Sequence, residues 1–247
     1  MKKLPLFFIL IFVGCTTVPT SIHQIQLGGK NNQTSSNLSN VKVGLDVLLD
    51  DRLELIQNKS IGLVTNQTGV DENGTPNYER FMALDDVTLK IIFSPEHGLF
   101  GEAAAGEKVQ YNGQMKSLPK VVSLYGKNRK PTKEQLADLD IIIYDIQDIG
   151  ARFYTYISTM GLVMEAAAEA GIQIIVLDRP NPITGNQVEG PILNLNNQSF
   201  VGYYPIPIRY GLTVGELAKM IVGEKWISHL PDLTVIPIEN WQRSQWV

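Results

Sequence analysis

Short runs of aliphatic and β-branched residues alternate with longer stretches in which apolar residues recur every three or four positions, and this pattern begins near Val41. Such an alternation is typical of α/β proteins, in which an open, mostly parallel sheet is covered by helices. The short runs predict strands at Val41–Leu45, Ser60–Thr65, Thr88–Ser94, Asp140–Asp145, Ile172–Leu177 and Leu233–Ile238.

Helical spacing is clearest between the fourth and the fifth of these predicted strands. There the apolar positions lie three or four apart, at Phe153, Ile157, Met160, Met164 and Ala168. Gly171 follows, and glycine commonly ends helices because it adopts left-handed backbone angles easily. A second helix, Thr213–Val222, is predicted because Glu216 follows Thr213 at the spacing of a capping box. A third helix is expected over Lys133–Leu139.

The beginning of the chain has the pattern of a targeting segment. Two lysines precede an apolar run over 4–14, which is shorter than the roughly 20 residues that span a bilayer and is typical of a signal-peptide core. Cys15 follows a glycine, as in the lipobox of bacterial lipoproteins, although Phe12 stands where that pattern usually has leucine. We expect residues 1–15 to be a lipoprotein signal peptide with Cys15 as the lipidated residue. The alternative is an ordinary signal peptide that contains an incidental cysteine.

Residues 16–40 are rich in Ser, Thr, Asn, Gln and Gly, a composition that predicts a flexible tether between the lipid and a globular domain over 41–247. The expected location is the cell envelope, with the protein held at a membrane by its lipid anchor or secreted. Thr16 does not match the aspartate that retains many lipoproteins at the inner membrane, so the periplasmic face of the outer membrane is favoured.

Charge and composition exclude several classes of function. The chain has 21 Lys and Arg against 25 Asp and Glu, a net charge of −4, and no basic stripe, so nucleic acid is not an expected partner. A single cysteine excludes an intrachain disulfide and every zinc site built from several thiolates. No phosphate-binding loop, dinucleotide fingerprint or G-x-S-x-G motif occurs, and the histidines lack metal-binding spacing. We therefore expect neither a cofactor nor a metal.

Polar clusters follow four of the predicted strands, over 66–69, 95–98, 145–152 and 178–182. In open parallel sheets, ligands bind outside the carboxyl ends of the strands, which makes Asn66 in the first cluster a candidate substrate-binding residue. Many of these residues are ordinary turn formers. Turn formation does not explain four residues in these clusters, namely Glu96, His97, Arg152 and Arg179.

Glu96 is the first catalytic candidate. It follows Pro95 at the end of an apolar strand, and partial desolvation there would favour the neutral form of a carboxyl group, which suits a general acid. The alternative is a hydrogen-bond acceptor that stabilises the loop. His97 could share a proton network with Glu96, or bind a metal beside it. The glycine- and alanine-rich residues 98–106 are expected to form a turn over the site or a plain linker.

Asp148 is the second carboxylate candidate. Because Asp145 and Asp148 lie three apart at a strand end, at most one is expected to face the ligand, and Asp148 is nearer the loop. The alternative is that one of them caps the following helix. Arg152 and Tyr154 lie near the start of that helix, where an arginine needs an anionic partner. Arg152 is therefore predicted to bind a carboxylate, either that of Asp148 or one on a ligand.

Two further residues suit either a structural or a binding role. Arg179 could bind substrate or form an internal salt bridge with its neighbour Asp178. Glu189 is a loop carboxylate that could contact substrate as a second acid or base.

Three motifs, over 94–98, 145–156 and 178–182, together closely resemble a bacterial family of exo-β-N-acetylmuramidases that was long known as a domain of unknown function. The similarity runs from about Val43 to the end of the chain. It implies a Rossmann-like domain with helices on both faces of the sheet, followed by a smaller C-terminal domain, and it implies Glu96 as the catalytic carboxylate. Relatives of this kind continue beyond the point where this chain stops, so we expect the smaller domain to be missing.

The resemblance also implies a substrate. Members of the family release N-acetylmuramic acid from the non-reducing ends of peptidoglycan fragments, so the expected partner is a muropeptide or a peptidoglycan-derived glycan. Glycosidases commonly use two carboxyl groups, but the 2-acetamido group of this sugar leaves a substrate-assisted route open. An arginine such as Arg152 would suit its lactyl carboxylate. The alternative function is a non-catalytic, envelope-tethered lipoprotein that binds sugar.

Overall fold

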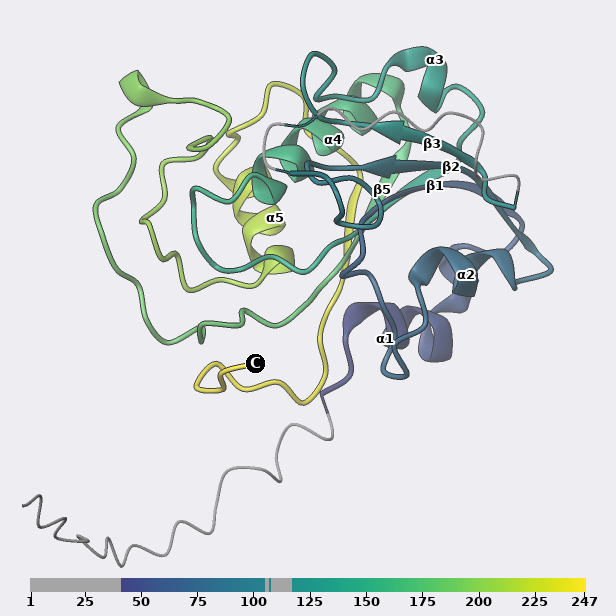
Figure 1. Cartoon of the computed structure of the whole chain (residues 1–247), viewed down its shortest axis with the longest axis horizontal. Helices are drawn as coiled ribbons and strands as arrows, with labels where there is room; N and C mark the ends of the chain where they lie inside the picture. Colours follow the sequence, from purple (N-terminus) through teal and green to yellow (C-terminus); the bar gives the residue numbers. More distant parts are fainter. Residues whose placement is uncertain (1–40, 105–106, 108–116) are drawn as a thin grey trace, which may run out of the picture. The chain divides into compact units, whose positions relative to one another are not determined.

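The computed structural model describes residues 41–104, 107 and 117–247. The predicted signal peptide, Cys15 and the predicted tether lie outside these residues. Within them, one six-stranded sheet has the order β3-β2-β1-β4-β5-β6, and every neighbouring pair is parallel (Figure 1). The strands are β1 Lys59–Thr65, β2 Val87–Ser94, β3 Lys120–Ser123, β4 Ile141–Asp145, β5 Gln173–Leu177 and β6 Leu233–Ile236. This order is that of the Rossmann fold, as the resemblance implied.

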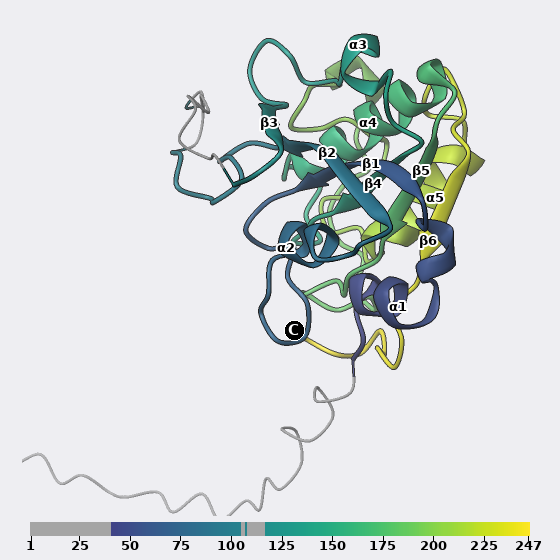
Figure 2. The ribbon, with the colours of Figure 1, turned by 90° about the vertical axis from the view of Figure 1, so that its right-hand side faces the viewer.

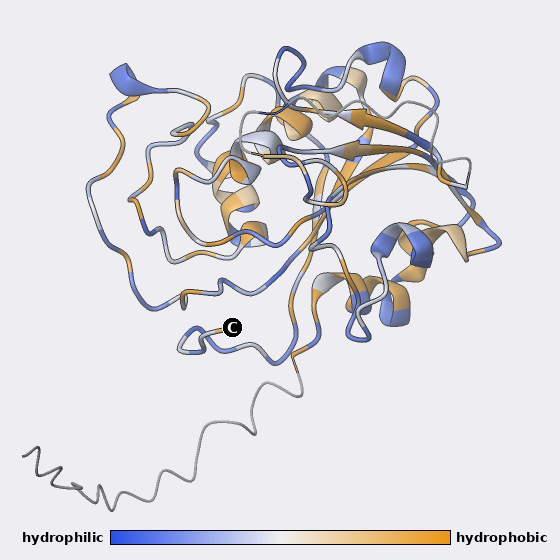
Figure 3. Ribbon diagram, in the orientation of Figure 1, coloured by the Kyte–Doolittle hydropathy of each residue, from blue (hydrophilic) through white to orange (hydrophobic). Residues whose placement is uncertain are grey.

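Helices cover both faces of the sheet (Figures 1 and 2). On one face lie α1 and α2, and on the other lie α3, α4 and α5. Their bounds are α1 Gly44–Asp51, α2 Asn77–Met82, α3 Lys133–Leu136, α4 Tyr156–Ala170 and α5 Val214–Gly223, with short 3-10 helices at Leu53–Leu55 and Leu195–Asn197. Apolar residues concentrate on the strands and on the helix faces that meet them (Figure 3). Each helix layer thus buries its own apolar core against one face of the sheet.

Strand prediction failed at the start of the described fold. The predicted strand Val41–Leu45 is wrong, because α1 begins at Gly44 and only Lys42 makes a bridge, with Glu239. Gly44 donates its N–H to the Asp178 carbonyl at 2.8 Å, and a side chain there would overlap the backbone of β5 and β6. The alternating apolar residues therefore belong to a helix that starts against the sheet edge. The short edge strand β3 and the short helix α2 were not predicted.

The predicted helix caps are correct, but two of the predicted helix bounds are wrong. Gly171 ends α4 with a φ of 71°, and Thr213 and Glu216 form the predicted capping box of α5. The predicted apolar stripe of α4 is wrong at Phe153, which precedes the helix and is 57% exposed. The predicted helix over 133–139 stops at Leu136, after a capping box at Thr132.

Gly161 is where α4 meets the buried side chain of Tyr204, because a Cβ at Gly161 would overlap the Tyr204 hydroxyl. We predict that Gly161→Ala lowers the free energy of unfolding by about 1–3 kcal/mol, as other overpacked cores do. Urea denaturation would measure this loss. The matched control is Gly223→Ala at the end of α5, where an added Cβ meets no atom within 4 Å. Equal stability of the two variants would contradict the packing argument.

Candidate active site

Four parallel strands, β1, β2, β4 and β5, bring the predicted polar clusters to one edge of the sheet. Thr65 at the end of β1 pairs with Asp145 at the end of β4, and Ser94 at the end of β2 pairs with Ser123 of β3. The order in which successive strands are added to the sheet reverses between β1 and β4, and this is the switch point where Rossmann folds usually hold a ligand.

Glu96 leaves this edge directly after β2 and is partly buried. Its Oε2 accepts a hydrogen bond of 2.9 Å from the Thr155 hydroxyl, at the N-terminal cap of α4. A hydrogen bond from the Tyr125 hydroxyl to Glu96, together with partial burial, raises the pKa of the Tyr125 phenol. Two hydroxyl groups from separate connections of the fold therefore hold one carboxyl group.

Tyr154, Tyr156 and Asn66 belong to the same group of side chains. The rings of Tyr154 and Tyr156 meet edge to face, with centroids 4.8 Å apart. Burial raises the pKa of Tyr156, Tyr154 and the charge of Glu96 raise it further, and a hydrogen bond from Asn66 opposes this. The predicted residues Asn66 and Tyr154 are thus brought together with Glu96 around a phenol that stays protonated at neutral pH.

His97 lies in a tight turn beside Glu96. Its φ of 71° is unusual for a residue other than glycine, and Gly98 and Gly101 also have positive φ. The Nδ1 atom is 2.8 Å from the Ala103 carbonyl, which can only accept a hydrogen bond, so Nδ1 carries a proton, and in the neutral ring Nε2 is an acceptor. Residues 97–104 therefore form the turn that was predicted, and residues 105–106 lie outside the described residues.

Asp145 and Arg179 fill the switch point with a buried ion pair. Arg179 Nε lies 2.6 Å from Asp145 Oδ1, and Nη2 lies 3.0 Å from Oδ2. Their side chains are 5% and 0% exposed, and Asn77 donates a third hydrogen bond to Asp145. Arg179, predicted to bind substrate, is thus occupied within the fold. The alternative salt bridge with Asp178 is wrong, because Asp178 accepts instead from Thr213, Gly215 and the Arg179 backbone.

Asp148 is enclosed in the structure and does not face an opening. It is 4% exposed, and its Oδ2 accepts hydrogen bonds from the Gly150 N–H at 2.7 Å and from the Tyr210 hydroxyl. Burial raises its pKa to about 6. The alternative that Asp145 or Asp148 caps α4 is wrong, since no side chain caps this helix and the partners of both carboxylates lie elsewhere.

Arg152 and Glu189 hold the long connection between β5 and α5. Arg152 Nη1 donates to the carbonyls of Pro191 and Ile206, at 2.8 and 2.5 Å, so its predicted pairing with Asp148 is wrong. Glu189 is 65% exposed and pairs with Arg209 at 3.0 Å. Both predicted substrate contacts therefore have structural partners within the connection.

Sequence reasoning missed Tyr125, Thr155 and Tyr210 as partners of the two carboxylates. Thr155 lies inside a motif that was recognised, so its position could have been found. Tyr125 follows the unpredicted strand β3, and Tyr210 lies far from Asp148 in sequence. No local sequence pattern therefore indicated that either tyrosine would bind a carboxylate.

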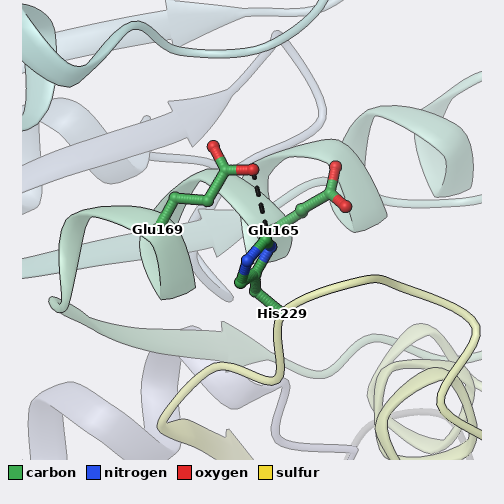
Figure 4. Close-up of side chains that lie close together, drawn as sticks. All are labelled: Glu165, Glu169 and His229. Carbon is green, nitrogen blue, oxygen red and sulfur yellow. Dashed lines mark ion pairs between the residues drawn. The ribbon is translucent and has the colours of Figure 1, made fainter.

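One group of described side chains has the composition of a metal site: Glu165, Glu169 and His229 each have a possible ligand atom within 4.8 Å of the others (Figure 4). Lys130 Nζ lies 3.0 Å from Glu165 and 2.7 Å from Glu169, and His229 lies 3.7 Å from Glu169. Because the ammonium group already pairs with both carboxylates, we interpret the cluster as an ion-pair network on α4. None of the helices in the described ranges has the length and apolar composition that a bilayer span requires.

These features define a Rossmann-type α/β domain with a carboxyl group, phenols and an amide at the carboxyl edge of its sheet. Residues 61–247 match the family described as exo-beta-N-acetylmuramidase NamZ, N-terminal. The chain belongs to this family, as its motifs indicated.

Individual relatives agree with this assignment. The chain is 47% identical over 213 residues to a Bacillus subtilis protein named peptidoglycan beta-N-acetylmuramidase NamZ, covering 86% of this chain and 50% of that protein. It superposes on a crystal structure of a DUF1343 family protein from Bacteroides fragilis with a TM-score of 0.77 and 45% identity, covering 83% of this chain and 52% of the other. A second such protein of that organism gives a TM-score of 0.71 at 36% identity, with 85% and 55% covered. The chain thus spans about half the length of these relatives.

The enclosed carboxyl of Asp148 should make stability depend on pH. Burial raises its pKa from 3.8 to about 6, so the folded chain retains a proton that the unfolded chain releases between these values. The stabilising contribution is full below pH 3.8 and is lost as the pH rises through about 6. Between pH 4 and 7.5, we expect Asp148 to lower the unfolding free energy by up to about 3 kcal/mol.

Asp148→Asn should therefore weaken this pH dependence, because an amide does not ionise. Urea denaturation across the pH range would compare it with the wild type and with Asp138→Asn, an exposed control. Burial also raises the pKa of Asp178 to about 6. Asp178 is present in all three proteins, so it contributes equally to the pH dependence of each. An unchanged pH dependence in Asp148→Asn would contradict the assignment.

Proposed function

We propose that this chain is part of an enzyme that hydrolyses peptidoglycan fragments and releases N-acetylmuramic acid from their non-reducing ends, with Glu96 as its catalytic acid. The observation that carries the proposal is the position of Glu96: partly exposed, at the carboxyl edge of a Rossmann sheet, and held by the hydroxyls of Thr155 and Tyr125. The 47% identity to a protein named as a peptidoglycan β-N-acetylmuramidase supports the substrate class.

In the proposed reaction, the Glu96 carboxyl group donates its proton to the glycosidic oxygen as the bond to the sugar C1 breaks. The two hydroxyls fix the carboxyl group in one orientation, which lowers the entropy lost on reaching the transition state. His97 lies next to it with Nε2 as an acceptor, and can take a proton from the attacking water in the second half of the reaction.

The surroundings of Glu96 favour a substrate-assisted route. Asp148 is enclosed under Tyr210, and Glu189 is paired with Arg209. The 2-acetamido oxygen of the substrate can attack C1 itself, so that no protein nucleophile is required. Tyr156 and Asn66, next to Glu96, are 3% and 2% exposed and therefore support the site from within the fold.

Glu96→Gln should lower kcat on a chromogenic N-acetylmuramic acid β-glycoside by about 10²–10⁴-fold, because glutamine cannot donate the proton, while KM changes little. Steady-state kinetics would measure both constants. Glu79→Gln, an exposed carboxylate on α2, is the matched control and should behave as the wild type. Unchanged release by Glu96→Gln would refute the role of Glu96. If the wild type binds the sugar but releases no N-acetylmuramic acid from the substrate, this result would support the alternative, a sugar-binding lipoprotein.

We also propose that the protein acts at the cell envelope, anchored through Cys15, because its substrate lies outside the cytoplasmic membrane. The predicted lipobox supports this location. Cells fed labelled palmitate should incorporate label into the wild type and into Thr16→Ala but not into Cys15→Ser. Equal labelling of the Cys15→Ser variant would rule out the anchor.

A further inference from the structure

Arg129 is an exposed arginine with its guanidinium stacked on an aromatic ring. Its Cζ lies 4.2 Å from the centroid of the Phe200 ring. In the described part of the chain, no carboxylate forms an ion pair with it. Stacking holds the plane of a guanidinium while its N–H groups still point outward at the edge. Arg129 is thus an oriented cation with donors available to a ligand.

The edge of the sheet places Arg129 near Glu96. The Leu124 N–H donates to the Ser94 carbonyl at 2.8 Å, so the chain after β3 leaves the sheet beside the chain after β2. Tyr125 then reaches Glu96 with its hydroxyl, and the charge of Arg129, four residues further on, acts on the same phenol.

Helix α4 places Arg129 near Glu96 by an independent route. The Phe200 carbonyl accepts a hydrogen bond of 2.7 Å from the Ser158 hydroxyl. Thr155, which donates to Glu96, lies three residues earlier, and residues three apart are neighbours on one helix face. The backbone of Phe200, whose ring lies beneath Arg129, is therefore fixed about one helical turn from Thr155, which holds the Glu96 carboxyl.

Lys130 fixes the other side of this arrangement. Its ammonium group binds Glu165 and Glu169, which continue the face of α4 that carries Thr155 and Ser158. The chain from Tyr125 to Lys130 is thus held at both ends, at Glu96 through Tyr125 and on α4 through Lys130, and Arg129 lies between these two attachments.

We propose that Arg129 binds the lactyl carboxylate of N-acetylmuramic acid and thereby makes the site prefer this sugar to N-acetylglucosamine. This inference rests on the proposed function. The two sugars differ only in the lactyl ether on O3, whose carboxylate lies about one sugar ring away from the glycosidic oxygen that Glu96 would protonate. A guanidinium pairs with a carboxylate through two parallel charge-assisted hydrogen bonds, and Arg129 has such donors unengaged.

The arginine expected to play this part, Arg152, already donates to the carbonyls of Pro191 and Ile206. Arg179 and Arg209 are likewise occupied, by Asp145 and Glu189. Binding a ligand through these arginines would require hydrogen bonds inside the fold to break, whereas binding through Arg129 would not.

The test compares two chromogenic β-glycosides, one of N-acetylmuramic acid and one of N-acetylglucosamine, with the full chain. Arg129→Gln should lower kcat/KM for the muramic acid substrate about 10–100-fold, mainly through KM, and change that for the glucosamine substrate by less than about 2-fold. Arg129→Lys should retain part of the preference, because it keeps the charge but loses the planar pair of donors. Arg52→Gln, at an exposed site on the opposite helix layer, is the control.

Equal effects on the two substrates, or no effect on either, would overturn the proposal. Calorimetry with free N-acetylmuramic acid and N-acetylglucosamine separates it from the hydrolytic function, because binding needs no turnover. The wild type and Glu96→Gln should both bind the acidic sugar more tightly, and Arg129→Gln should lose the preference. The proposal for Arg129 would also be overturned if the wild type bound N-acetylmuramic acid no more tightly than N-acetylglucosamine, or did not bind it at all. This outcome does not depend on the Glu96→Gln kinetics.

Discussion

The buried ion pair between Asp145 and Arg179 is the constraint on which the carboxyl edge of the sheet depends. It joins the end of β4 to the chain after β5, and Arg179 also donates to the Val70 carbonyl in the connection after β1. Asn77 of α2 completes the bonding of Asp145. Removing one partner of such a pair would leave a buried charge without compensation, which typically destabilises a protein by about 3–5 kcal/mol. Three connections are thus held in one arrangement.

Because this pair occupies the switch point, the candidate site lies to one side of the usual ligand position of a Rossmann fold. It forms where β2 and β3 end and where α4 begins, around Glu96. The hydroxyls that bind Glu96 come from the two connections on either side of it. A rigid edge behind the site and a carboxyl group held from two directions are what general acid catalysis requires.

Helix α4 acts as the common support of this site. Along one face it binds Glu96 through Thr155, the Phe200 segment through Ser158, and Lys130 through Glu165 and Glu169. The connection after β3 and the long connection before α5 are both tied to this face. The candidate catalytic carboxyl and the segment that carries Arg129 are therefore both attached to one helix, although they come from separate parts of the chain.

The sequence by itself determined the elements whose signals are local. Five of the predicted strands, the Gly171 end of α4 and the capping box at Thr213 follow from runs of apolar residues and from backbone rules that involve near neighbours. Its motifs also placed Glu96, His97, Asn66 and Tyr154 at one edge. Val41–Leu45 was assigned wrongly because its alternation suits a strand, and only its contact with β5 and β6 makes it the start of a helix.

Tertiary structure decided which charged and polar groups meet. Arg179 pairs with Asp145 and not with Asp178, Arg152 bonds to carbonyls and not to Asp148, and Asp148 is enclosed under Tyr210. These partners lie tens of residues apart in sequence, and the energy of an ion pair or hydrogen bond depends on distances of a few ångströms that no local pattern encodes. The position of Arg129 has the same origin, because it arises from the pairing of β2 with β3 and from stacking on Phe200, whose carbonyl is bound by Ser158 of α4.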